Sequence, residues 1–306
     1  AVALSVPLGK WMYRVFAPVS PTRFDALLQT VIGKAARRDQ NWKEYSLALL
    51  FFNLLMFGFV VLVLSLQQLL PLNPDRMGAL TPDLIFNTAA SFVTNTNMQH
   101  YSGEASMSYA SQLFGMMYLQ FVSAATGMAA LVAAARWLGG AKGPNNFFMD
   151  LARSTFGVLL PVAVVTALLL VFCGVPMTFD GAATVRTLEG AVQTIARGPV
   201  AAFVAIKQLG TNGGGFFGPN AAHPLENVGF FCNLIECVAL VVIPMGCIWL
   251  YGYITGHRKH ALVIFLVMLA FLGIKLGFAS VLESSPSAAL QSLAVTQSGN
   301  LEGKEL

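Results

Sequence analysis

Two short stretches of the sequence carry oxygen-rich residues that could bind a cation. Thr94-Asn95-Thr96-Asn97 and Thr211-Asn212-Gly213-Gly214-Gly215 combine hydroxyl and amide side chains with glycines. Glycine lets successive backbone carbonyls point inward without a side-chain clash. Rows of carbonyl and hydroxyl oxygens can replace the hydration shell of a weakly hydrated ion such as potassium, whereas divalent ions favour carboxylate ligands. The composition therefore favours a potassium filter.

A glycine-rich stretch can also be a plain flexible loop or a phosphate-binding nest, although a nest usually follows a strand, and no strand is predicted here. The spacing to an upstream proline favours the filter, since twelve positions separate both Pro82 from Thr94 and Pro199 from Thr211. Thr81-Pro82-Asp83 is typical of a helix start. We therefore expect short re-entrant helices over 82–93 and 199–209, the second capped by Gly210.

The composition indicates the class of protein to which such helices would belong. Of 306 residues, 56% are hydrophobic and only 10% are charged, against ~25% charged in an average soluble domain. This excludes an ordinary soluble enzyme and a disordered chain, and a net charge of +4 is too small for a nucleic-acid binder. The four cysteines all lie in apolar runs and are predicted to be free thiols. A polytopic membrane protein remains.

Five apolar runs are long enough to span a bilayer as helices: 47–70, 110–138, 154–175, 228–253 and 261–282. Basic residues gather before the first run, between the second and third, and between the fourth and fifth, so these links should be cytoplasmic. Both oxygen-rich stretches then fall in outward-facing links. The fold class predicted is an all-α membrane protein built from repeated units of span, re-entrant helix, filter loop and span.

This pattern divides the chain into four parts. We expect an N-terminal segment and cytoplasmic link over 1–46, a first pore repeat over 47–138 and a second over 139–255. The remainder, 256–306, would hold the first span of a third repeat and an outward-facing tail. There is no charged start followed by an apolar run, so no signal peptide is expected.

Several ionisable residues need an interpretation of their own. Glu104 and Glu226 could form a negative outer vestibule or could favour nearby helix N-termini. Glu236 and Lys275 fall at similar depth in two antiparallel spans, which suggests an intramembrane ion pair. Alternatively, Lys275 reaches the outer interface while Glu236 sits in the vestibule. His100 and His223 are expected to be polar loop residues rather than metal ligands. 

The residue sequences of both motifs resemble those of a known family. Five segments resemble the potassium-binding subunit of the bacterial Kdp-type potassium-transporting ATPase: residues 86–104 and 206–227, together with 41–43, 71–74 and 302–305. The resemblance implies a four-repeat pore of the potassium-channel superfamily, of which this chain covers about the N-terminal half. It also aligns Asn95 with Thr211, one residue away from the register that the proline spacing gives. By resemblance the filter residues are Asn95, Thr96, Asn97, Thr211, Asn212 and Gly213, with Gln99 and Gly214 flanking them and Gln99 tuning affinity.

The same resemblance implies a function in the bacterial plasma (inner) membrane. The chain would bind and translocate potassium, while a partner P-type ATPase catalytic subunit hydrolyses ATP and small accessory membrane subunits complete the complex. The sequence has neither a Walker A motif nor an Asp-Lys-Thr-Gly-Thr phosphorylation motif, so it is not expected to be an enzyme. Potassium is the only ligand expected. Two alternatives stay open: a truncated, non-conducting remnant, and a subunit of a passive potassium channel or secondary transporter.

Overall fold

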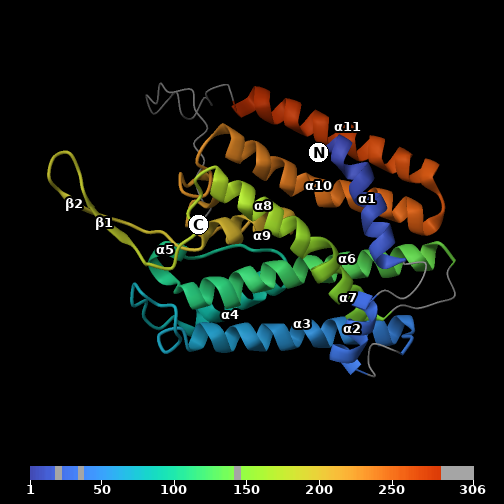
Figure 1. The fold of residues 1–306 in the computed structure, drawn as a ribbon, viewed down its shortest axis with the longest axis horizontal. Coiled ribbons are helices and arrows are strands. Elements are labelled where there is room, and N and C mark those ends of the chain that lie inside the picture. Colours follow the sequence, from blue (N-terminus) through green and yellow to red (C-terminus); the bar gives the residue numbers. More distant parts are fainter. Residues whose placement is uncertain (18–22, 34–37, 141–145, 284–306) are drawn as a thin grey trace.

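The computed structural model describes residues 1–17, 23–33, 38–140 and 146–283 (Figure 1). The N-terminal part holds α1 Val2–Phe16, α2 Arg23–Ile32, α3 Trp42–Ser65, α4 Pro82–Val93 and α5 Gly103–Ser106. A π-helix, η2 Ser111–Met117, continues directly into α6 Tyr118–Leu138. After it come α7 Phe147–Ala152, a second π-helix η3 Arg153–Leu159, α8 Leu160–Phe172, β1 Ala183–Arg186, β2 Val192–Ile195, α9 Val200–Leu209, the 3-10 turn η4 Asn220–Ala222, α10 Phe230–Thr255 and α11 Arg258–Glu283.

Five of the helical segments are long and apolar enough to cross a membrane, which makes this an integral membrane protein. They are Trp42–Ser65, Ser111–Leu138, Phe147–Phe172, Phe230–Thr255 and Arg258–Leu282. The five predicted runs are confirmed, with shifted ends for the first and third. The earlier starts come from polar caps: Asn41 forms a capping box with Glu44, and Asn146 caps α7. Polar N-caps start these helices upstream of the apolar runs.

The described parts of the three links predicted to be cytoplasmic lie at one end of the molecule. Asn146 donates from Nδ2 to the carbonyl of Arg38 (2.9 Å), which joins the second link to the first. A Cβ built on Gly139 would lie 3.2 Å from Thr255, which joins the second link to the third. The β1–β2 hairpin lies at the other end (Figure 1). The loops that follow α4 and α9 begin between the two ends, where Thr94 and Thr211 share a cavity with Asn53 of α3 and Thr126 of α6. The basic residues of 34–37 and 141–145 and the tail 284–306, including the 302–305 motif, lie outside the described residues.

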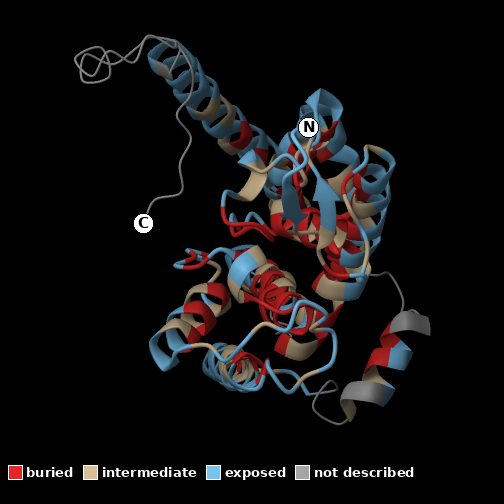
Figure 2. Ribbon diagram, turned by 90° about the vertical axis from the view of Figure 1, so that its left-hand side faces the viewer, coloured by how far each residue is buried: buried red, intermediate tan, exposed pale blue. Residues whose placement is uncertain are grey.

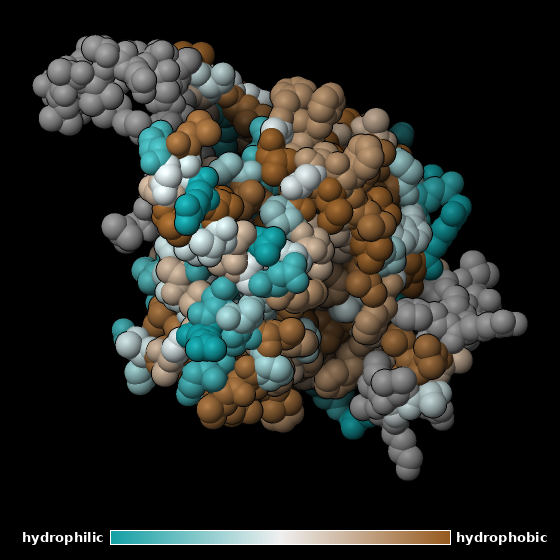
Figure 3. All heavy atoms as spheres, turned by 60° about the vertical axis from the view of Figure 1, so that its left-hand side comes forward, coloured by the Kyte–Doolittle hydropathy of each residue, from teal (hydrophilic) through white to brown (hydrophobic). Residues whose placement is uncertain are grey.

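The core has two main parts. One surrounds α4 and α9 and is rich in aromatic side chains, including Phe92, Phe203, Phe216 and Phe217. The other joins α1, α6, η3 and α10. Among the five spans α6 is the most buried and α11 the least, and Figure 2 shows α11 extending away as a mostly exposed helix. Figure 3 shows a broad continuous band of hydrophobic side chains beside a more hydrophilic area, as expected where lipid meets one part of a surface.

Two ion pairs with buried carboxylates fasten the end opposite the β1–β2 hairpin. Arg136 donates from Nη1 to both carboxylate oxygens of Asp150 (2.9 Å each), and Arg153 donates to Asp25. Arg136 also donates to the carbonyl of Phe16 at the C-terminal end of α1 (2.9 Å). These contacts hold α1, α2, α6 and the α7–η3 helix in one arrangement.

Candidate functional site

The helices α4 and α9 each end where an oxygen-rich stretch begins. α4 runs from Pro82 to Val93 with Thr94 as its C-cap, as the proline and the Thr81 start predict. α9 runs from Val200 to Leu209 with Gly210 as its C-cap. The prolines hold different cap positions, since Pro82 is the first helical residue and Pro199 is the N-cap. The two helices also differ in length, with 12 residues in α4 and 10 in α9, so the spacing from the prolines does not set the register. The C-caps align Thr94 with Gly210, and not with Thr211.

The backbone of the two loops follows one pattern from that point. Asn95 (φ 61°) and Asn97 (φ 56°) are left-handed, and so are Thr211 (φ 54°) and Gly213 (φ 96°). The intervening Thr96 and Asn212 are not. This supports the register that pairs Asn95 with Thr211. A left-handed β-branched Thr211 is uncommon and strained, a feature that concentrates at functional sites.

Alternating the sign of φ turns successive carbonyl groups toward one side of the chain, which is the geometry that a carbonyl-lined ion site needs. Within the described part of the chain, no hydrogen-bond donor reaches the carbonyl oxygens of residues 95–97 or 211–213. Six backbone oxygens are thus free to contact a ligand. Thr96, Thr211 and Gly213 are also exposed, whereas Asn97 and Asn212 are buried.

The two loops contact each other directly. The Asn212 amide donates to Oδ1 of Asn95, and Oγ of Ser123 on α6 donates to the same oxygen (2.9 Å). Nδ2 of Asn95 in turn donates to the carbonyl of Gly210 (3.5 Å) at the end of α9. The C-terminal ends of α4 and α9 therefore converge, and each end carries a partial negative charge that favours a cation.

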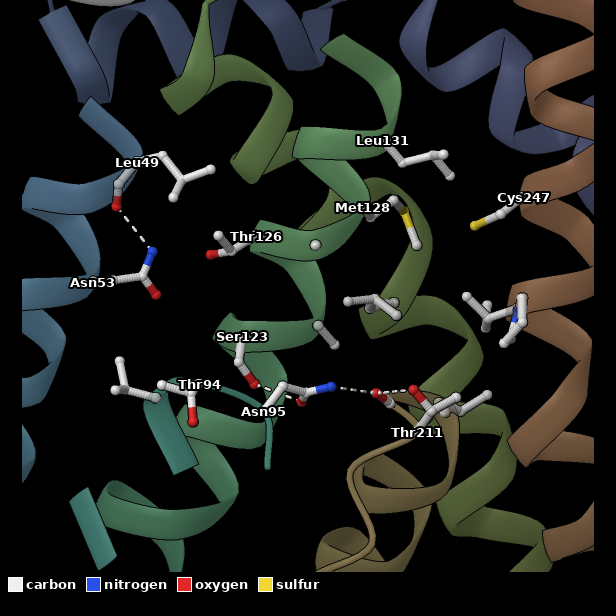
Figure 4. Close-up of a pocket in the computed structure, with 18 of the residues that line it drawn as sticks. Leu49, Asn53, Thr94, Asn95, Ser123, Thr126, Met128, Leu131, Thr211 and Cys247 are labelled. Carbon is white, nitrogen blue, oxygen red and sulfur yellow. Dashed lines mark hydrogen bonds between the residues drawn. The ribbon is translucent and has the colours of Figure 1, made fainter. Parts of the chain in front are cut away.

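A cavity of about 530 Å³ lies next to this junction (Figure 4). Its polar lining comes from two loop segments and two helices: Thr94, Asn95 and Thr211, with Asn53 of α3 and Ser123 and Thr126 of α6. Much of the remaining wall is apolar and includes Leu49, Leu131 and Cys247. The cavity is thus a mostly apolar chamber with a few polar groups, and it lies beside the free oxygens of the loops.

The part of the second loop after Gly213 is held by side chains instead. Gln120 donates to the carbonyl of Gly214 (2.7 Å), and Gln112 donates to that of Phe216 (3.0 Å). Gln99 of the first loop makes two hydrogen bonds with Gly215, donating to its carbonyl (2.9 Å) and accepting its N–H (3.0 Å). The predicted flanking residues Gln99 and Gly214 thus lie in this outer part. Gln112 and Gln120 were not predicted from the sequence.

The two glutamates predicted at the outer mouth contact the same segment. Glu104 accepts the N–H of Gly218 (2.7 Å) and is half-buried. Glu226 is fully buried, accepts the N–H of Phe217 (2.8 Å) and forms an ion pair with Lys207 of α9. The vestibule prediction is therefore wrong for Glu226, because a buried and paired carboxylate presents no charge to solvent. A lysine inside the apolar 199–209 stretch was the sequence signal for this partner.

Glu236 and Lys275 do not pair. Glu236 accepts a hydrogen bond from Nε2 of Gln208 (2.6 Å) and lies beside Cys232. Lys275 is exposed on α11, and none of the ion pairs of the described residues includes it. Equal depth in two spans is not enough to predict an ion pair, because the two side chains must also point toward each other.

The two loop histidines differ in their surroundings. His100 is exposed, whereas His223 stacks on the ring of Phe217, with centroids 3.8 Å apart and planes 9° apart. Nδ1 of His223 accepts the N–H of Leu225 (3.1 Å). Burial lowers the pKa of His223 below its ordinary value, against the opposing charges of Glu104 and Glu226. No group of three potential metal-ligating His, Cys, Asp or Glu side chains occurs within the described ranges. All four cysteines are free thiols, and Cys237 is exposed.

Comparison with known proteins gives one consistent result. A family model described as the A subunit of a potassium-transporting ATPase matches residues 1–306. A potassium-transporting ATPase potassium-binding subunit of Pseudomonas putida is 46% identical over 297 residues, which cover 96% of this chain and 52% of the relative. A protein of the same description from Rhodopseudomonas palustris is 42% identical over 313 residues, covering 100% of this chain and 55% of the relative. The chain thus spans about half the length of the curated relatives it matches.

Proposed function

Since the chain belongs to the family of potassium-transporting ATPase A subunits, we propose that it binds potassium and passes it across the bacterial plasma membrane. It does so as the non-catalytic, ion-selective part of an ATP-driven uptake complex. The observation that carries this proposal is the pair of loops with the same alternation of φ and six carbonyl oxygens that no described residue engages. Asn95, Thr96 and Asn97 supply one side of the ion site, and Thr211, Asn212 and Gly213 supply another.

In this proposal α4 and α9 are re-entrant pore helices. Residues 47–138 form one pore repeat, 139–255 form the second, and 256–306 begin a third. The partial negative charge at the C-terminal ends of both helices lowers the cost of removing water from the ion. Because the relatives are about twice as long, further loops of the complete subunit close the ring around the ion.

The cavity beside the loops is the next position for the ion. Its hydroxyl and amide groups, from Asn53, Ser123 and Thr126, can contact the ion or its water molecules. From there potassium passes toward a P-type ATPase catalytic subunit, which hydrolyses ATP. Small accessory membrane subunits complete the assembly. An ATPase partner is supported by the relatives, which are potassium-binding subunits of a potassium-transporting ATPase. The accessory subunits are implied by the motif resemblance.

Transport by the complete subunit tests the proposal. The chain is joined to the remaining half of the P. putida relative and expressed with the partner subunits of that complex, and uptake of potassium and rubidium into vesicles is measured with and without ATP. We expect saturable, ATP-dependent uptake that prefers potassium. Uptake that persists without ATP or without the catalytic subunit indicates a passive channel or secondary transporter. Assembly without any ion uptake indicates a non-conducting remnant, and either result contradicts the proposal.

A further inference from the structure

Three buried glutamines engage three successive carbonyl oxygens of the second loop. Gln120 donates to Gly214, Gln99 to Gly215 and Gln112 to Phe216, at 2.7, 2.9 and 3.0 Å. Gln112 and Gln120 have no exposed surface, and Gln99 is 3% exposed. Since buried polar groups are costly unless they are hydrogen-bonded, three such donors on one short segment are a specific arrangement.

The π-helix explains how two of these donors reach the same loop. Gln112 lies in η2 and Gln120 in α6, eight positions later. Two turns of an α-helix take ~7.2 residues, so in a regular helix the two side chains would be turned about 80° from each other. The wider turns of a π-helix absorb the extra residue and bring the two side chains close to one face. Insertions of this kind are frequent at functional sites.

The donors divide the second loop into two parts. The carbonyls of 211–213 are free, and those of 214–216 are taken. Three consecutive glycines, 213–215, would otherwise let these peptide planes rotate, because glycine is the least restricted residue. Each glutamine bond fixes one peptide plane and so limits how far the adjoining free carbonyls can turn. A site that distinguishes ions of similar size depends on such restriction.

We propose that Gln112 and Gln120 are positioning residues that set ion discrimination by fixing the outer part of the second loop. The inference rests on the proposed function, because it concerns the same ion site. Both side chains donate to backbone carbonyls that follow the free ones along the loop, and not to the free carbonyls themselves. They act through the free carbonyls of Thr211, Asn212 and Gly213.

The test compares Gln120→Met and Gln112→Met with Gln67→Met in the complete subunit assembled with its partners. Gln67 is a matched control: it is also fully buried, and it hydrogen-bonds to Gly78, Ser106 and Ser111 with no contact to either oxygen-rich loop. The readouts are the KM of uptake for potassium and for rubidium, and the melting temperature of the purified complex. The KM ratio is the KM for rubidium divided by the KM for potassium. We expect it to fall about tenfold in the Gln120 and Gln112 variants, because losing one buried hydrogen bond can cost that much discrimination. Gln67→Met lowers the melting temperature and leaves the ratio unchanged.

A second substitution keeps the inference testable if Gln120→Met does not assemble. Gln120→Asn keeps a buried amide but shortens the side chain by one methylene, so its N–H no longer reaches the Gly214 carbonyl, and it should also reduce the KM ratio. An unchanged ratio in every assembled Gln112 and Gln120 variant overturns the inference, and so does an equal fall in Gln67→Met. If the unsubstituted complex shows no dependence on potassium, the proposed function itself fails, which is a distinct outcome.

Discussion

The buried ion pair between Lys207 and Glu226 gives the sharpest test of how the second loop is held. The side chains are 2% and 0% exposed. Lys207 also accepts the N–H of Asn212 through its carbonyl (2.9 Å), and Glu226 accepts that of Phe217 (2.8 Å). The pair therefore joins the end of α9 to both ends of the loop. Removing one partner leaves a buried, uncompensated charge.

We predict that Lys207→Met lowers the free energy of unfolding by about 3–5 kcal/mol, the range for breaking a buried pair. Lys207→Met combined with Glu226→Gln should recover most of this loss. The neutral amide no longer carries an unpaired charge, and its oxygen can still accept the Phe217 N–H. We expect the double variant to lie within about 1–2 kcal/mol of the original chain. Denaturant titration in mixed micelles measures each value.

Arg38→Met is the control, because Arg38 pairs with Glu44 at an exposed site where its side chain is 74% exposed. Exposed pairs contribute about 0–1 kcal/mol, so this variant should change little. The reasoning is refuted if Lys207→Met costs no more than Arg38→Met. It is also refuted if the double variant is as unstable as Lys207→Met alone, since burial of a lone charge would then not be the cause.

Three further predictions concern neighbouring residues. Gly213→Asp should weaken the preference for potassium over rubidium in uptake assays, because it adds a carboxylate at a free carbonyl and costs about 1–2 kcal/mol at φ 96°. Gly103→Ala should lower the free energy of unfolding by about 1–3 kcal/mol, measured by denaturant titration, since its Cβ would lie 2.1 Å from the carbonyl oxygen of Phe216. Because the pKa of His223 is lowered in the folded chain, the unfolded chain binds more protons than the folded chain as the pH falls, and this destabilises the fold. Between pH 7.5 and 5 the original chain should therefore lose more stability than His223→Gln; equal losses would contradict this.

Local sequence signals predicted much of the architecture. The length of the apolar runs identified five spans, and the Thr81-Pro82-Asp83 start gave α4 its observed limits. Such features depend on residues close together in the chain. The short hairpin β1–β2 was not predicted, since its strands of four residues each are mostly exposed and lack the alternation that marks a buried face.

Tertiary contacts set the limit of the prediction for the site. Lys207 and Glu226 are nineteen positions apart, and no local pattern links them. In the sequence, Gln112 and Gln120 are isolated polar residues of an apolar span. Their contacts with the second loop depend on the π-helix, which the sequence pattern does not reveal. The pairing of Glu236 with Lys275 was wrong for the same reason, because depth in a span does not determine which way a side chain points. The filter residues themselves remain a prediction that the φ pattern supports.

The most direct test of the account is to locate the ion. A structure of the complete subunit with its partners, determined in thallium or rubidium, gives anomalous density at each bound monovalent cation. We predict density between the loops, within contact distance of the carbonyl oxygens of residues 95–97 and 211–213. Density that avoids both loops while occupying other parts of the complex would contradict the central claim.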